Sequence, residues 1–80
     1  MKIIALNLPR DLSEDELAKL FKGHGAVDSC DLVMDTNTGI SKGFGFIEMP
    51  VAEEAEAAIA ALHGTKINKS KIRVKPSTQN

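Results

Sequence analysis

The chain has 80 residues, of which 42% are hydrophobic and 26% charged, and its formal net charge is −1. This size and composition are those of one small globular domain, and no apolar run approaches the roughly 18 residues of a membrane span. Cys30 is the only cysteine, which excludes an internal disulfide, and the N-terminal residues lack a secretion-signal pattern. We therefore expect a cytoplasmic protein that has no contact with a membrane.

The first part of the chain predicts a strand, a helix and a second strand. Residues 2–8, KIIALNL, form a short apolar run of the kind found in strands. Ser13 and Glu16 have the spacing of a capping box, and the apolar residues after them recur at helical spacing until Gly23. The stretch VDSCDLVM, residues 27–34, is typical of another strand.

The second part predicts two more strands and one more helix. Residues 35–43 are polar and rich in turn formers, which indicates a loop, and residues 43–49 form the third strand. Residues 51–64 are rich in alanine and predict a helix. The alternating stretch KIRVK, residues 71–75, predicts the last strand.

This order of elements predicts a fold of the α+β class. It is the βαββαβ order of the ferredoxin-like sandwich, in which two helices cover one face of a four-stranded antiparallel sheet. Residues 1–76 then form a single domain, and residues 77–80 form a polar C-terminal tail. Because the first strand starts directly after Met1, we expect a complete small protein.

Strand alternation predicts which face of the third strand is buried. One face carries Lys42, Phe44, Phe46 and Glu48. Burying these two phenyl rings against the helices would also bury two charged residues and expose Ile47 and Met49, at a cost of several kcal/mol for each unpaired charge. We therefore expect both rings on the open face of the sheet. The alternative is that both rings lie in the core and the two charged side chains escape at the strand ends.

The same alternation assigns the residues of the other three strands to the buried face or the open face of the sheet. Inward-facing residues are Ile3, Ala5, Cys30, Leu32, Met34, Ile72 and Val74. Residues expected on the open face are Lys2, Ile4, Leu6, Asp31, Val33, Lys71, Arg73 and Lys75. Exposed aromatic residues beside cations suit single-stranded nucleic acid, because unpaired bases stack on rings and phosphates attract lysine and arginine.

Two segments resemble the signatures of the RNA-recognition-motif family. KGFGFIEM, residues 42–49, agrees with the eight-residue signature at seven positions, and Met49 replaces the last aromatic residue. IIALNL, residues 3–8, resembles the six-residue signature of the first strand, although Ile4 stands where the family usually has an aromatic residue. The resemblance extends from Lys2 to about Lys75, and it implies the ferredoxin-like fold and binding of single-stranded RNA.

The resemblance also implies roles for individual residues. Phe46 would stack on one base, Phe44 would pack against a sugar or a neighbouring base, and Lys42 would meet a phosphate. Arg73 and Lys75 would contact base edges or the backbone of the RNA. The expected RNA-binding residues are thus Lys2, Ile4, Lys42, Phe44, Phe46, Arg73 and Lys75. With two rings in place of three and acidic residues on the same face, we expect weak binding to a strand of about two to four bases.

Other functions compete with this interpretation. Ile4 and the mild acidity of the chain favour a protein–protein interaction module on the same fold, and single-stranded DNA is a second possible ligand. An enzyme is disfavoured, because His24, His63 and Cys30 lie far apart in the sequence and lack the grouping that catalysis needs. We expect no cofactor and no metal site, and a monomer or weak dimer that acts as an RNA chaperone or post-transcriptional regulator.

Overall fold

The computed structural model describes residues 1–39 and 41–77, with the backbone alone at residues 41 and 42. It contains two helices and six strands. In chain order these are β1 (Lys2–Leu6), α1 (Glu14–Lys22), β2 (Ser29–Met34), β3 (Ser41–Glu48), α2 (Ala52–Leu62), β4 (Lys66–Ile67), β5 (Ser70–Lys71) and β6 (Arg73–Pro76). The predicted residues 78–80 of the tail lie outside the described residues.

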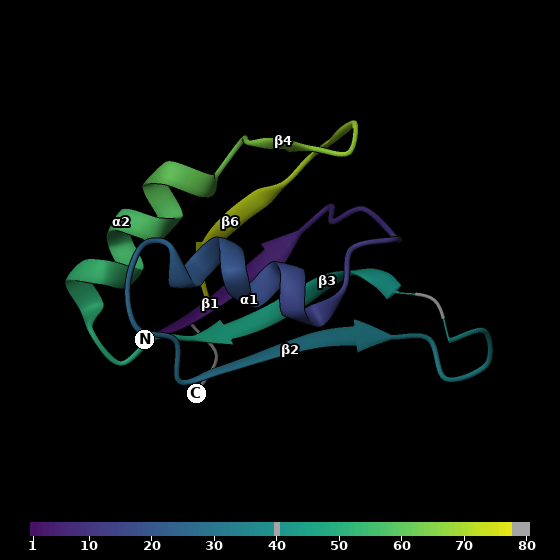
Figure 1. The fold of residues 1–80 in the computed structure, drawn as a ribbon, viewed down its shortest axis with the longest axis horizontal. Coiled ribbons are helices and arrows are strands. Elements are labelled where there is room, and N and C mark those ends of the chain that lie inside the picture. Colours follow the sequence, from purple (N-terminus) through teal and green to yellow (C-terminus); the bar gives the residue numbers. More distant parts are fainter. Residues whose placement is uncertain (40, 78–80) are drawn as a thin grey trace.

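Four of the strands form one antiparallel sheet in the order β2-β3-β1-β6. Helix α1 packs against β2 and helix α2 packs against β6, so that the two helices form one layer over the sheet (Figure 1). The predicted α+β, ferredoxin-like plan is confirmed. Among the described residues, no helix is long and apolar enough to cross a membrane.

Helix α1 begins at the predicted capping box. The Glu16 backbone N–H donates to Ser13 Oγ at 3.1 Å, and the Ser13 backbone N–H donates to Glu16 Oε1 at 3.3 Å. These reciprocal bonds satisfy two of the amide groups that the start of a helix leaves without partners. The helix then buries Leu17 and Phe21 against the sheet.

The core lies between the sheet and the helices. Ile3, Ile47 and Met49 are fully buried, and Val74 is almost so. Phe44 and Phe46 are outside this cluster, on the other side of the sheet, and each is half-buried. The predicted alternation of β3 is therefore confirmed, and the alternative with both rings in the core is wrong.

The prediction for Met34 is wrong, since its side chain is 45% exposed. Between the pairs Leu32–Gly45 and Met34–Ser41, the register advances two residues on β2 and four on β3. Such an irregularity bends the strand pair, and Met34, the last residue of β2, lies beyond it. Gly43, with φ +87°, lies within this irregularity and adopts a conformation that favours glycine.

A short hairpin before the last strand was not predicted. Strands β4 and β5 pair antiparallel through a two-residue turn at Asn68 and Lys69, both of which have positive φ. Lys71, which we expected on the open face of the last strand, belongs to β5 instead. Its backbone oxygen accepts a 2.8 Å hydrogen bond from Asn7 Nδ2, which holds the hairpin against the end of β1.

Two neighbouring isoleucines in β1 test which face of the sheet is buried. Ile3 is fully buried and Ile4 is half-buried on the open face. We expect Ile3→Ala to lower the free energy of unfolding by about 2–5 kcal/mol, because it leaves a cavity. Ile4→Ala should cost roughly half of that or less, because it removes less buried area. Urea unfolding of both variants checks this, and equal losses would contradict the assignment.

Candidate nucleic-acid interface

The open face is the side of the four-stranded sheet that the helices leave uncovered. Its residues include Lys2, Ile4, Leu6, Ser29, Asp31, Phe44, Phe46, Glu48, Arg73 and Lys75. Strand register arranges them in rows across the sheet. One row contains Asp31, Phe46, Ile4 and Lys75, and the next contains Phe44, Leu6 and Arg73. Neighbours in a row are about 4.8 Å apart, which is the spacing between paired strands.

The two phenyl rings form the centre of this face. The ring centroids of Phe44 and Phe46 are 6.2 Å apart and the ring planes are nearly perpendicular, at 88°. This edge-to-face contact stabilises both rings in fixed orientations. A flat base can lie parallel to one ring only, so the other ring is left to contact a sugar or the next base.

A lysine lies close to Phe46. Lys2 Nζ is 5.5 Å from the centroid of the Phe46 ring, within the range of a cation–π interaction. Lys2 comes from the start of β1, directly opposite Glu48 of β3 in the register. Its ammonium group is therefore within reach of a base or phosphate that approaches the ring.

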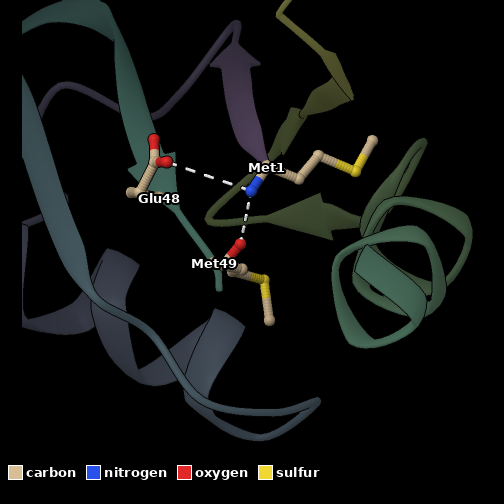
Figure 2. A network of polar contacts seen from close by, with 3 residues as sticks. All are labelled: Met1, Glu48 and Met49. Atoms are coloured by element: carbon tan, nitrogen blue, oxygen red, sulfur yellow. Dashed lines mark hydrogen bonds and ion pairs between the residues drawn. The ribbon is translucent and has the colours of Figure 1, made fainter. Parts of the chain in front are cut away.

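Glu48 is compensated by the N-terminal ammonium group. The Met1 ammonium nitrogen donates to the Met49 backbone oxygen at 2.6 Å and lies 3.9 Å from Glu48 Oε1 (Figure 2). The Met49 backbone N–H donates in turn to the Met1 oxygen at 3.0 Å. These contacts extend the pairing of β1 with β3 and reduce the repulsion that Glu48 would exert on a phosphate.

The two basic residues of β6 lie at the edge of the open face. Arg73 is the register partner of Leu6, and Lys75 is the register partner of Ile4; both side chains are exposed. Within the described part of the chain, neither cation has a hydrogen-bond or ion-pair partner. Lys42 belongs to β3 by its backbone, but the prediction for its side chain lies outside the described residues.

Leu6 is a member of this face that we did not single out as a binding residue. It lies between Phe44 and Arg73 in the second row and is half-buried. The alternation of β1 already placed it on the open face. Together with Ile4 it continues the apolar surface of the rings toward β6.

Two of the residues that we considered for catalysis make contacts with the backbone of neighbouring elements. Cys30 is half-buried under α1, and its Sγ contacts the Glu14 backbone oxygen at 3.9 Å. His63 Nδ1 accepts a 3.1 Å hydrogen bond from the Val74 backbone N–H at the outer edge of β6. In the described residues, no three His, Cys, Asp or Glu side chains are grouped to hold a metal ion.

Comparison with known proteins identifies the family. The family model described as the RNA recognition motif matches residues 5–73. The chain belongs to this family, as its two sequence signatures suggested. The match contains both helices, β2 and β3 in full, and it reaches the last two residues of β1 and the first residue of β6.

Two curated plant proteins show what kinds of protein contain such a domain. The chain is 44% identical over 68 residues to the 28 kDa chloroplastic ribonucleoprotein of Spinacia oleracea, a match that covers 85% of the chain and 29% of that protein. It is 41% identical over 73 residues to the chloroplastic RNA-binding protein CP31B of Arabidopsis thaliana, which covers 91% of the chain and 25% of that protein. The chain thus spans less than a third of the length of either relative.

Solved structures share the whole fold. The crystal structure of RNA binding protein PG1 superposes with a TM-score of 0.93 at 35% identity, covering 100% of this chain and 96% of that one. The RNA recognition motif of Rna15 with bound GU RNA superposes with a TM-score of 0.90 at 26% identity, covering 98% of this chain and 83% of that one.

The relatives overturn the expected cytoplasmic location. Both curated relatives are named as chloroplastic proteins, so the prediction of a cytoplasmic location is wrong by this comparison. A single cysteine and the lack of a secretion-signal pattern are compatible with any reducing compartment. Cysteine usage therefore does not distinguish the cytoplasm from the interior of an organelle.

The thiol of Cys30 gives a test of the local environment. Burial, with a smaller contribution from the nearby Glu14 carboxylate, raises the pKa of Cys30 from 9.0 to about 11. The unfolded thiol ionises more readily, so the thiol's contribution to stability is present below pH 9 and is lost as the pH rises toward 11. We expect iodoacetamide to modify the folded chain with a midpoint near pH 11 and the urea-unfolded chain with a midpoint near 9. A folded midpoint at or below 9 would contradict this assignment.

Proposed function

We propose that the open face binds a short single strand of RNA, with no chemical step and no cofactor. The observation that carries this proposal is the pair of phenyl rings, held edge-to-face outside the core beside exposed cations. Residues 1–76 act as one binding unit in this proposal. An RNA chaperone or post-transcriptional regulator is the role that such binding supports.

The ligand must have unpaired bases. Stacking of a base on an aromatic side chain contributes about 1–3 kcal/mol, and it requires a base whose flat face is free. In duplex RNA the bases are already stacked on one another, so the rings of Phe44 and Phe46 cannot reach them. Ile4 and Leu6 add apolar contact with a base or ribose, although they cannot replace a third ring.

The charges of the open face act in opposite directions. Lys2, Arg73 and Lys75 attract the phosphates, while Asp31 and Glu48 repel them. Two rings contribute about 2–6 kcal/mol before the cost of ordering the strand, and micromolar binding requires about 8 kcal/mol. Binding of two to four bases with micromolar or weaker affinity follows from this balance.

The named functions of the relatives support the same ligand. One is a ribonucleoprotein, another is an RNA-binding protein, and the Rna15 domain was solved with RNA bound. Because this chain matches only 25–29% of those two relatives, their remaining segments are no guide to its partners.

Replacing the ring of Phe46 tests the stacking. Phe46→Leu keeps an apolar side chain but removes the aromatic face, so we expect the Kd for a short single-stranded RNA to rise about 5- to 100-fold. Phe46→Tyr keeps the ring and should bind like the original chain. Fluorescence anisotropy with a labelled hexanucleotide measures both, and melting curves check that the fold is intact. Unchanged binding by a folded Phe46→Leu variant would favour the protein-interaction alternative.

The salt dependence of binding tests the role of β6. If Arg73 contacts a phosphate, Arg73→Gln should reduce the slope of log K against log salt concentration by about 0.7, the value for one contact to a single strand. Lys19→Gln removes a positive charge from the exposed surface of α1 and serves as the matched control. Its slope should equal that of the original chain. Equal slopes for all three proteins would show that Arg73 does not contact a phosphate of the bound RNA.

A further inference from the structure

The row through Phe46 has opposite charges at its two ends. The register places Asp31, Phe46, Ile4 and Lys75 side by side on four adjacent strands. Three inter-strand spacings make this row about 14 Å long. Asp31 and Lys75 are both exposed, and across residues 1–39 and 41–77 no hydrogen bond or ion pair occupies either charge.

Asp31 differs in this respect from Glu48, the other acid of the open face. The Glu48 carboxylate lies 3.9 Å from the Met1 ammonium group, and its register partner is Lys2. The register partner of Asp31 is the aromatic Phe46. Side chains of directly opposed residues lie about 5 Å apart at Cβ, so the Asp31 carboxylate is beside any base that stacks on this ring.

The two ends of the row require different hydrogen-bonding groups on that base. An ionised carboxylate only accepts hydrogen bonds, and an ammonium group only donates them. The base must therefore present donors toward β2 and acceptors toward β6. Guanine does so, since N1–H and the N2 amino group are neighbouring donors on its Watson–Crick edge, and the acceptors O6 and N7 form the adjoining Hoogsteen edge.

The other bases match the row less well. In adenine the N6 amino group lies between the acceptors N1 and N7, so a carboxylate that accepts from N6 meets an acceptor on either side. Cytosine and uracil have their hydrogen-bonding groups on one edge, and their opposite edge is C–H. Each of these bases can satisfy one end of the row but does not offer both a pair of neighbouring donors and a separate pair of neighbouring acceptors.

We propose that Asp31 and Lys75 make the base site on Phe46 selective for guanine, with Asp31 accepting from N1–H and the N2 amino group and Lys75 donating to O6 and N7. This inference rests on the proposed function and adds the identity of the preferred base. Asp31 then has a specific role in recognition, in addition to its unfavourable effect on phosphates.

The test uses heptaribonucleotides with one variable base between two runs of three uridines. The central base is guanine, adenine, cytosine, uracil, inosine (which lacks the N2 amino group) or 7-deazaguanine (which lacks N7). We expect the original chain to bind the guanine strand about tenfold more tightly than the others. Asp31→Asn should abolish the difference between guanine and inosine, and Lys75→Met should abolish the difference between guanine and 7-deazaguanine.

Asp28→Asn is the matched control, because it removes the same charge just before β2, outside the open face. This variant should rank the six strands by affinity in the same order as the original chain does. Binding that depends on Phe46 but has no guanine preference, or a preference that Asp31→Asn leaves intact, would overturn this inference and leave the proposed function standing. No binding to any of the six strands would overturn both.

Discussion

The burial of Ile47 and Met49 determines what the open face presents. Both side chains lie under the helices with no exposed surface. Because successive residues of a strand point to opposite faces, this burial directs Phe44, Phe46 and Glu48 outward. A shift of one residue would bury two phenyl rings together with a carboxylate, and the cost of that buried charge makes the observed register much more stable.

Pairing with the neighbouring strands determines which side chains lie next to the two rings on the open face. Register with β1 sets Ile4 and Leu6 beside the two rings, and β6 then adds one cation to each row. On the other side, β2 contributes Asp31. The result is a small apolar platform with positive charge along one edge and a single acid at the other. This arrangement of charges is the basis of the base selectivity that we propose.

The helices protect the two outer edges of this platform. On β2, the Leu32 backbone N–H donates to Glu14 Oε2 at 3.0 Å, from the first residue of α1. On β6, the Val74 backbone N–H donates to the ring of His63, which follows the last residue of α2. Each bond occupies a backbone amide that would otherwise be free to pair with another strand. The same bonds connect β2 to the start of α1 and β6 to the end of α2.

The sequence by itself determined the βαββαβ order of the main sheet and its two helices, the capping box of α1, and the faces of β1, β3 and β6. These features depend on local periodicity and on the cost of burying charge. Only the tertiary structure decided the exposure of Met34, the β4–β5 hairpin that removes Lys71 from the open face, and the pairing of Glu48 with Met1. These features depend on register shifts and on contacts between residues far apart in the chain, which no local pattern encodes. The register that sets Asp31 beside Phe46 is of the same kind, since alternation gives the face of a residue and only strand pairing gives its neighbour.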